Sequence, residues 1–248
     1  MLIHGVQMVV EPSVKDLFDG LRAPREVVER WFADVPLNDR RSAVKPLEGK
    51  YFLKIYAYAG LWRLRTLFIE ARAGREFRNL KRLRELGFRV PEPVAWGQAR
   101  TLGFVSESFL LTRAVENAIE LRKLIDDPKS APFPLPGPRE RRRLIVEFAT
   151  TLRRAHDAKF FIHTLRFKNL LLAREGDGYA LFVIDVPFAG IWRYRLMPGA
   201  GRVRDVAVLM KGARQLLSKT DRMRFARAYG AGRDLLRAAR AYQEKHYP

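Results

Sequence analysis

The order in which hydrophobic patterns follow one another along the chain is the feature that most constrains its fold. After two short leading segments with helical spacing, the first half is dominated by strand-like runs such as YFLKIYAY (51–58). In the second half most apolar residues recur every three or four positions, and one pair of strand-like runs is inserted at 161–188. Because strands and helices are grouped rather than alternating, this order predicts an α+β fold with a strand-rich lobe followed by a mainly helical lobe.

The chain of 248 residues is long enough for two small lobes, which we place at 1–112 and 113–248, with their connection near 112–117. The elements predicted for the first lobe are helices over 14–21 and 24–35, a strand, turn and strand within 41–60 with the turn at Pro46 to Gly49, a helix over 71–86, and two strands within 88–115.

Prolines set the layout of the second lobe. The run DDPKSAPFPLPGP (126–138) is too rich in proline for a regular helix and predicts a surface loop. Pro138 then stands near the start of a long amphipathic helix, and the turn REGDG joins the two strand-like runs that follow. From residue 202 onward the pattern is mostly helical.

Composition narrows the classes of function. Hydrophobic residues make up 48% of the chain, so a sizeable core can be buried. There is no cysteine, which excludes disulfides, thiolate metal sites and cysteine nucleophiles. Lys and Arg total 47 against 27 Asp and Glu, and the net charge of +20 favours polyanionic partners such as nucleic acid, anionic lipid headgroups or phosphorylated substrates.

The start of the chain, MLIHGVQMVVEPSVKD, has neither the basic region nor the apolar stretch of a signal peptide. No apolar run approaches the roughly 18–20 residues that span a bilayer. We therefore expect a soluble cytoplasmic protein, with peripheral contact to the anionic inner face of the cytoplasmic membrane as an extension of that expectation.

A polar cluster interrupts the strand pair of the second lobe. His163, Thr164, Arg166, Lys168 and Asn169 lie between two apolar runs, and the next strand ends in a lone acid within LFVIDVPF. A charge at the tip of a buried strand is costly unless a metal ion or hydrogen bonds compensate it. The layout predicts a phosphotransfer site, which needs cations for the nucleotide phosphates, oxygen ligands for a divalent metal and a carboxylate to orient the attacking hydroxyl.

Two longer motifs give this layout a family resemblance. REFRNLKRLRELGFRVPEPVAWG (75–97) and LRRAHDAKFFIHTLRFKNLLL (152–172) resemble the helix, strand entry and catalytic loop of the lipopolysaccharide core kinases. That family has the protein-kinase-like fold and phosphorylates Kdo or heptose sugars of the Gram-negative inner core. The resemblance runs from about residue 40 to about residue 230 and implies a bilobal kinase fold with a catalytic loop at 161–172 and a metal-binding strand end at 181–188.

The resemblance also implies ATP and Mg²⁺ as cofactors and assigns roles to four side chains. Lys54 matches the strand lysine that contacts nucleotide phosphates, and Glu76, on the following helix, would hold it in place. Asp185 and Asn169 match the two magnesium ligands. Each of these residues also has a structural interpretation: Lys54 and Glu76 as solvated surface groups, Asp185 as a strand-end cap and Asn169 as a turn residue.

Thr164 stands where the family pattern H-x-D-L-x-x-x-N has its catalytic aspartate. Counting back from Asn169 places Leu165 on the pattern's leucine and Thr164 on its aspartate, and an alignment shifted to His163 still finds no carboxylate. A threonine hydroxyl can orient an acceptor by hydrogen bonding but cannot act as a base near neutral pH. His163 is the alternative base, because it could titrate near neutrality; its other interpretation is a structural or surface histidine.

Four further residues have supporting roles in the resemblance. His156 matches a histidine at a helix end that packs structurally, and Asp205 resembles the buried aspartate that receives hydrogen bonds from the catalytic loop, with a helix cap as its alternative. Arg166 and Lys168 could hold an anionic acceptor such as a phosphorylated sugar, or form a basic rim. The segment RRSAVKPLEGK offers Gly49 but no G-x-G-x-x-G, so the sequence does not show how a nucleotide is covered.

Three functions follow from these patterns. The first is ATP-dependent phosphorylation of a sugar hydroxyl on a Kdo- or heptose-containing glycolipid, with a degenerate catalytic loop. The second is a pseudokinase that binds nucleotide or scaffolds a partner in envelope biogenesis, which Thr164 and the missing glycine-rich loop favour. The third, nucleic-acid binding, rests on charge alone, because no helix-turn-helix, zinc-ligand or aromatic RNA-binding pattern accompanies it.

Overall fold

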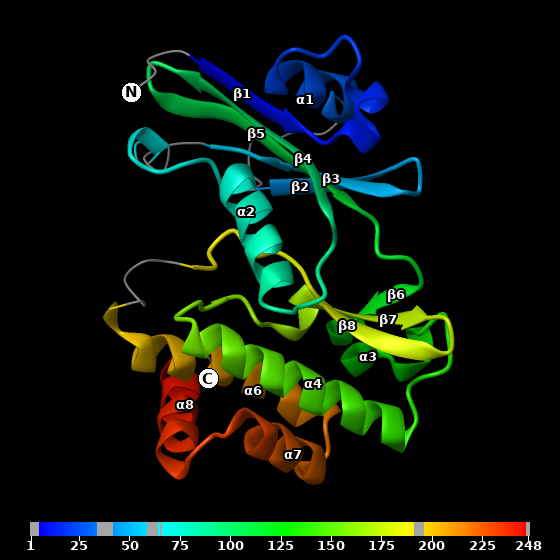
Figure 1. Cartoon of the computed structure of the whole chain (residues 1–248), viewed down its shortest axis with the longest axis vertical. Coiled ribbons are helices and arrows are strands. Elements are labelled where there is room, and N and C mark those ends of the chain that lie inside the picture. The colour runs from blue at the N-terminus through cyan, green and yellow to red at the C-terminus, as the bar shows by residue number, and fades with distance from the viewer. Residues whose placement is uncertain (1–4, 34–41, 59–63, 65, 191–195, 247–248) are drawn as a thin grey trace. The chain divides into compact units, whose positions relative to one another are not determined.

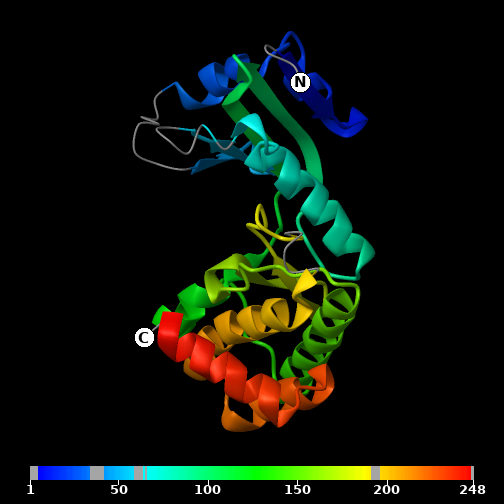
Figure 2. The same cartoon turned by 90° about the vertical axis from the view of Figure 1, so that its left-hand side faces the viewer.

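The computed structural model describes residues 5–33, 42–58, 64, 66–190 and 196–246 (Figures 1 and 2). The end of the helix predicted over 24–35 and both ends of the strand pair predicted within 41–60 lie outside the described residues. The chain divides into two compact units, Met1–Lys81 with Pro91–Ala114 and Arg82–Val90 with Val115–Pro248. Within the described ranges, no helix combines the length and apolar character needed to cross a membrane.

A five-stranded antiparallel sheet forms the centre of the first unit (Figure 1). Its strands follow the order β1-β4-β5-β3-β2 and comprise β1 (Gly5–Val10), β2 (Ser42–Leu47), β3 (Tyr51–Tyr56), β4 (Pro93–Thr101) and β5 (Phe104–Arg113). The helices that belong with the sheet are α1 (Pro24–Phe32) and α2 (Arg72–Glu85), and α2 covers the helix predicted over 71–86 to within one residue at each end.

Side chains along β3 alternate between the two faces of the sheet, as the pleat of a strand requires. Leu53 and Ile55 are buried in a core that includes Val27 and Phe32 of α1. The hydroxyl of Tyr56, on the other face, hydrogen-bonds to α2. The helices α1 and α2 therefore cover opposite faces of the sheet (Figures 1 and 2).

The helical spacing at the beginning of the first unit led to a wrong prediction. The helix predicted over 14–21 is not formed, and two single 3₁₀ turns, η1 (Pro12–Val14) and η2 (Asp16–Phe18), stand in its place. Gly20 has a φ of 78°, so helical backbone stops there, and the segment is too short to repay helix nucleation. Its apolar spacing instead buries Val14 and Phe18 in the core below the sheet.

Two details of the sheet also differ from the prediction. The edge strand β1 was not predicted; it pairs with β4, Gly5 opposite Arg100, so its partner is remote in sequence. Pro46 lies within β2 rather than in the turn. Because β2 is an edge strand, it can contain a proline at a position where no N–H is needed for pairing. The turn itself uses Glu48 and Gly49, both with positive φ.

The second unit is mainly helical, with one small antiparallel sheet in the order β6-β7-β8. Helix α4 (Pro138–Asp157) packs against α7 (Lys219–Tyr229), and α6 (Pro198–Leu216) packs against α8 (Arg233–His246). The α+β class predicted from the order of patterns is confirmed. The elements of this unit are β6 (Ala118–Glu120), α3 (Leu121–Asp126), η4 (Pro128–Ser130), α4 (Pro138–Asp157), η5 (Phe167–Asn169), β7 (Leu170–Glu175), β8 (Gly178–Val183), α6 (Pro198–Leu216), α7 (Lys219–Tyr229) and α8 (Arg233–His246).

Candidate functional site

The lysine predicted to contact phosphates is held by an ion pair in the first unit. Nζ of Lys54 lies 3.1 Å from Oε2 and 3.4 Å from Oε1 of Glu76. The hydroxyl of Tyr56 donates to the same Oε2, and only 3% of the Glu76 side chain is exposed. A buried carboxylate needs such partners because an unpaired charge would be strongly destabilising there. The contact expected between Lys54 and Glu76 is thus formed, and it fixes the ammonium group.

In the second unit, hydrogen bonds join three of the predicted site residues. Oγ1 of Thr164 donates to the backbone oxygen of Asp185 at 2.9 Å, and Nδ2 of Asn169 donates to the backbone oxygen of Thr164 at 2.9 Å. The N–H of Ile184 in turn donates to the backbone oxygen of Asn169 at 3.0 Å. Asp185 has a φ of 57°, a conformation that is unfavourable for a non-glycine residue and that the neighbouring contacts maintain.

Asp205 anchors the other side of this loop. It is fully buried on α6, and its two carboxylate oxygens accept the N–H groups of Ile162 and His163 at 2.7 and 2.6 Å. Nε2 of His156 lies 3.1 Å from Oδ2 of Asp205, and Nδ1 of the same ring lies 2.7 Å from the Tyr229 hydroxyl. The predicted structural residues His156 and Asp205 therefore meet in one network, which ties α4, α6, α7 and the loop together.

The electrostatics of this network favour a charged aspartate. Burial alone would raise the pKa of Asp205, but the hydrogen bond from His156, the charges of His156 and His163 and the N–H of Ile162 hold that pKa below its ordinary value. An ionised Asp205 accepts from Nε2–H of His156, whose Nδ1 lies against the Tyr229 hydroxyl. Burial raises the pKa of Tyr229 to about 12, so its hydroxyl is protonated at neutral pH.

The ring of His163 faces the anchored side of the loop. Its side chain has no exposed area, and Nδ1 lies 4.0 Å from Oδ1 of Asp205. The backbone adopts a φ of 64°, and the ring centroid lies 6.3 Å from that of Phe161. Thr164, which is half-buried, is the more accessible of the two residues considered for orienting an acceptor.

Two glycines that the sequence analysis did not single out allow the loop to dock on α6. A Cβ at Gly201 would lie 2.6 Å from the ring of Phe161, and a Cβ at Gly212 would lie 2.3 Å from the ring of Phe167. With Asp205 between them, the spacing G-x₃-D-x₆-G places all three residues on one face of the helix. That spacing is the signal from which the docking face could have been predicted.

The remaining predicted residues lie at the surface. Arg166 and Lys168 are exposed on either side of the buried Phe167. Gly49, in the turn between β2 and β3, has a φ of 65° and no atom within 4 Å of the position that a Cβ would occupy. The turn is therefore open on its glycine side.

The two predicted magnesium ligands, Asn169 in the loop and Asp185 after β8, have oxygen atoms of the kind that this ion takes. Mg²⁺ usually keeps several waters and takes one or two protein carboxylates together with phosphate oxygens of the substrate. The Asp185 carboxylate and the Asn169 amide supply such oxygens, and since Nδ2 of Asn169 donates to Thr164, Oδ1 is the atom left to ligate. Across the described residues, no group of three His, Asp or Glu side chains forms a cage that would hold a metal by protein ligands alone.

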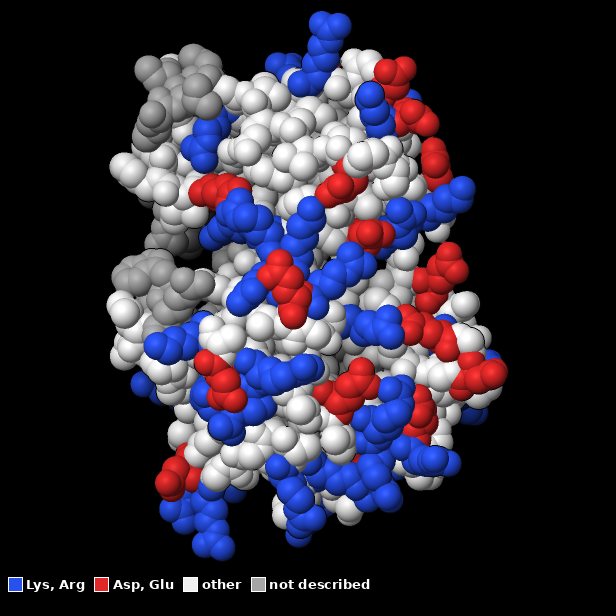
Figure 3. Space-filling view, in the orientation of Figure 1, with Lys and Arg blue, Asp and Glu red and all other residues white. Residues whose placement is uncertain are grey.

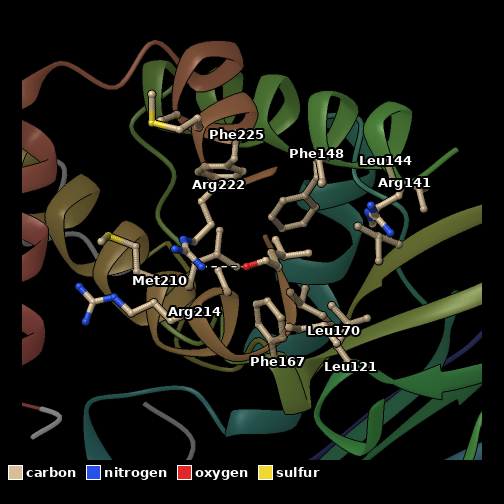
Figure 4. A pocket seen from close by; sticks show the side chains of 18 of the residues that line it. Leu121, Arg141, Leu144, Phe148, Phe167, Leu170, Met210, Arg214, Arg222 and Phe225 are labelled. Carbon is tan, nitrogen blue, oxygen red and sulfur yellow. Dashed lines mark hydrogen bonds between the residues drawn. The ribbon is translucent and has the colours of Figure 1, made fainter. Parts of the chain in front are cut away.

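A large apolar cavity lies elsewhere in the second unit (Figure 4). Its volume is about 670 Å³, within the range of about 300–1,000 Å³ that is typical of small-molecule sites. Phe148, Phe167, Leu170 and Phe225 point into it from four different elements. Arg222 extends between these side chains, and its Nη1 donates to the backbone oxygen of Leu217 at 2.8 Å.

Sequence comparisons point to one family. The sequence model of the lipopolysaccharide kinase (Kdo/WaaP) family matches residues 49–229. Two relatives from different strains of Haemophilus influenzae, both named 3-deoxy-D-manno-octulosonic acid kinase, are 31% and 29% identical over 146 residues. Each match covers 56% of this chain and 56% of the relative, so the chain spans about half the length of the curated relatives it matches.

Structural comparison gives the fold. The structure of WaaP in complex with acyl carrier protein superposes with a TM-score of 0.66 at 25% identity and covers 98% of this chain and 100% of that chain. A kinase domain of Mycobacterium tuberculosis PknI matches more weakly, with a TM-score of 0.44 and 17% identity over 82% of this chain and 89% of that domain. The protein-kinase-like fold predicted from the sequence is confirmed.

Proposed function

Because the chain belongs to the lipopolysaccharide kinase (Kdo/WaaP) family, we propose that it transfers the γ-phosphoryl group of ATP to a sugar hydroxyl of a Kdo- or heptose-containing glycolipid. The observation that supports the proposal most directly is the pair of hydrogen bonds that connect Thr164 to the backbone oxygen of Asp185 and to the side chain of Asn169. The net charge of +20 suits an acceptor that is itself anionic and peripheral contact with the inner face of the membrane.

Each functional side chain has a task that its surroundings permit. Lys54, oriented by Glu76, contacts the nucleotide phosphates as a point charge. Asp185 and Asn169 would hold Mg²⁺, and the bound ion would supply positive charge next to the phosphates. In the transfer, a bond forms between the acceptor oxygen and the γ-phosphorus, the bond to the β–γ bridging oxygen breaks, and ADP leaves. The hydroxyl proton passes to water or to a phosphoryl oxygen.

Thr164 is the residue that we assign to orienting the acceptor hydroxyl. Its hydroxyl donates to the backbone oxygen of Asp185, so its own oxygen can accept a hydrogen bond from an acceptor hydroxyl. The buried position of His163 beside Asp205 favours Thr164 over His163 for this role. Without a carboxylate, the rate depends on positioning and on metal electrostatics, which a loose transition state allows.

The alternative is a pseudokinase that keeps the fold and regulates a partner, and the missing carboxylate favours it. Two measurements separate the possibilities. ATP with Mg²⁺ should raise the Tm of the wild type, and Asp185→Asn should abolish that rise. Absence of a shift with any nucleotide would remove both the kinase and the nucleotide-binding pseudokinase. Transfer of ³²P from ATP to deacylated core sugar by the wild type would exclude the pseudokinase.

The apolar cavity supports a second proposal, that the second unit also binds an acyl chain. Apolar side chains line it and a cation, Arg222, reaches among them, which suits a hydrocarbon chain with a polar or anionic end. WaaP, which shares the fold over nearly the whole chain, has been solved with acyl carrier protein. An acyl carrier protein that presents its chain to this cavity is therefore the partner that we propose.

Titration calorimetry with laurate tests the cavity without the carrier. Wild-type protein should bind laurate, and Arg222→Met should weaken binding about tenfold, because a hydrogen bond to a charged group contributes about 1.5–3 kcal/mol. Arg233→Met, at the exposed start of α8, is the matched control and should bind as the wild type does. Failure of the wild type to bind saturated acids of any chain length would refute the acyl site and leave the kinase proposal intact.

A further inference from the structure

Net charge does not locate the surface at which an anionic partner binds. Figure 3 shows Lys and Arg spread over the visible face of the molecule, with acidic side chains among them. A hollow that gathers cations is more informative, because walls of low dielectric strengthen the attraction between a bound anion and the charges around it. The second unit contains such a hollow beside the catalytic loop.

This hollow, which we call the anion pocket, has a volume of about 320 Å³ and lies where α3, η5 and α6 meet. Its apolar floor is formed by the buried Phe167 and Val208 and the half-buried Ile125. The polar side chains that line it are Arg122, Arg166, Lys168, Lys211 and Gln215.

The contact between Phe167 and Gly212, which docks the loop on α6, also brings cations of the loop and of α6 together. The ring of Phe167 packs against Gly212, at a point where no Cβ could fit. Arg166 and Lys168 flank that ring in sequence, and Lys211 adjoins the glycine, so one contact places three cations around one hollow. Gln215 stands one helical turn beyond Lys211 and adds an amide to the lining.

The fourth cation comes from α3. Arg122 is about half exposed and makes two contacts with Asp126 on the same helix, from Nη2 to Oδ1 at 3.0 Å and from Nε to Oδ2 at 3.2 Å. These contacts use Nη2 and Nε, so Nη1 of Arg122 remains to contact a ligand. Four cations thus line the hollow, and this chemistry selects an anionic group with several acceptor oxygens.

The pocket is coupled to the reacting loop through the backbone. The N–H of Arg166 donates to the oxygen of Thr164 at 2.7 Å, and the oxygen of Arg166 accepts the N–H of Asn169 at 2.8 Å. A ligand held by Arg166 and Lys168 is therefore positioned relative to the residues assigned to the acceptor hydroxyl and to the metal. A charged group of the acceptor that binds in the anion pocket, in addition to the hydroxyl that reacts, would therefore determine which acceptors are used.

We propose that the anion pocket binds a phosphate or carboxylate carried by the acceptor sugar and thereby selects acidic over neutral acceptors, with Arg122 and Lys211 as specificity-determining residues. The inference rests on the proposed kinase function, and its new content is the site and the chemistry that it selects. A sugar phosphate and an acid sugar share this chemistry, so both are used as probes.

The test is calorimetric titration of the full chain with glucose 6-phosphate, with 3-deoxy-D-manno-octulosonic acid and with neutral glucose, in the absence of nucleotide. Wild-type protein should bind at least one of the two acids at least tenfold more tightly than glucose. The double variant Arg122→Gln/Lys211→Gln should lose about tenfold or more of that affinity, since each removed charge weakens a charge-assisted hydrogen bond. The matched control is Arg139→Gln/Lys245→Gln, which removes two exposed cations outside the pocket and should bind as the wild type does.

The two acids separate the sources of the anion. Preference for glucose 6-phosphate assigns the pocket to a phosphate, and preference for the octulosonic acid assigns it to a carboxylate. Equal binding of glucose and both acids by the wild type, or equal losses in the pocket and control variants, would overturn the proposal. The Tm shift with ATP and Mg²⁺ is measured in parallel on every variant. If that shift is absent while acid binding persists, the kinase proposal fails and the anion-pocket proposal stands. If the shift is present but neither acid binds, only the anion-pocket proposal fails.

Discussion

The two units fix their functional groups in different ways. In the first unit, Lys54 is held by one ion pair between side chains of β3 and α2. In the second, Asp205 binds two backbone N–H groups of the loop and the ring of His156, while Gly201 and Gly212 admit two phenylalanine rings. The first arrangement orients one charge, whereas the second determines the course of the backbone. Substitutions in the first unit should therefore affect activity more than stability, and substitutions under the loop should affect stability first.

The largest expected effect tests the first half of this comparison. Lys54→Met should lower the rate of phosphate transfer about 10³-fold, because it removes a charge aimed at the phosphates. It should lower the Tm only moderately, because the Tyr56 hydroxyl still donates to the buried Glu76 carboxylate. Initial rates with ³²P-labelled ATP and a thermal melt check it. Lys50→Met, at the exposed end of the neighbouring turn, is the matched control and should keep full activity. An equally inactive control would show that the loss of activity does not depend on the charge at Lys54.

Asp205→Asn tests the other half. It should lower the free energy of unfolding by about 3 kcal/mol, because a charged acceptor of several buried hydrogen bonds is lost. The exposed Asp177→Asn should stay within about 0.5 kcal/mol of the wild type. Urea denaturation measures both, and a similar small loss in the two variants would mean that the loop is held by its packing alone.

The same pair of proteins has a predicted pH dependence. The folded-state pKa of Asp205 lies below its ordinary value of 3.8, so its contribution is complete above that value and is lost as the pH falls through the folded-state pKa. The difference in unfolding free energy between the wild type and Asp205→Asn should be constant near neutral pH and should shrink only below about pH 4. A difference that already shrinks between pH 7 and 5 would contradict an ionised Asp205.

Thr164→Asp adds the carboxylate that the loop lacks. The rate of transfer should rise about 10²-fold, the contribution typical of a positioned base, provided that Thr164 occupies the acceptor-orienting position. Thr150→Asp, at an exposed position on α4, provides a control for the added charge and should leave the rate unchanged. An unchanged or lower rate in Thr164→Asp would show that another residue faces the acceptor.

The smallest effect concerns the docking face. Gly212→Ala should cost about 1–3 kcal/mol, because its methyl group would collide with the ring of Phe167. Gly199→Ala, in the first turn of the same helix and with no atom within 4 Å of its Cβ position, should be neutral or slightly stabilising. Equal melting temperatures for the two variants would mean that the loop can shift without cost.

Much of the candidate site follows from spacing along the chain. The pairing of Lys54 with Glu76 is present in the structure. The register that sets Thr164 and Asn169 on the catalytic loop and Asp185 at the end of the later strand agrees with the hydrogen bonds between them. Their roles in catalysis stay predictions. The positions of these residues could be predicted from spacing because each lies on, or next to, a helix or strand with a strong local pattern.

Other features could not be read from the sequence in this way. The burial of His163 depends on which way the loop turns, and that is decided by Asp205 on a helix about forty residues later. The helix predicted over 14–21 failed because the apolar spacing of Val14 and Phe18 serves a core that they share with residues far away in sequence. The pairing of β1 with β4 was missed for the same reason.

By itself, the sequence determined the grouping of strands and helices, the α+β class and the spacing of the predicted phosphotransfer residues, because these depend on patterns among near neighbours in the chain. The tertiary structure alone decided which side of the loop is anchored, where cations converge around Phe167 and where apolar side chains leave a cavity. Those outcomes depend on contacts between segments that are remote in sequence. The local spacing of apolar residues does not show which remote segments pack together.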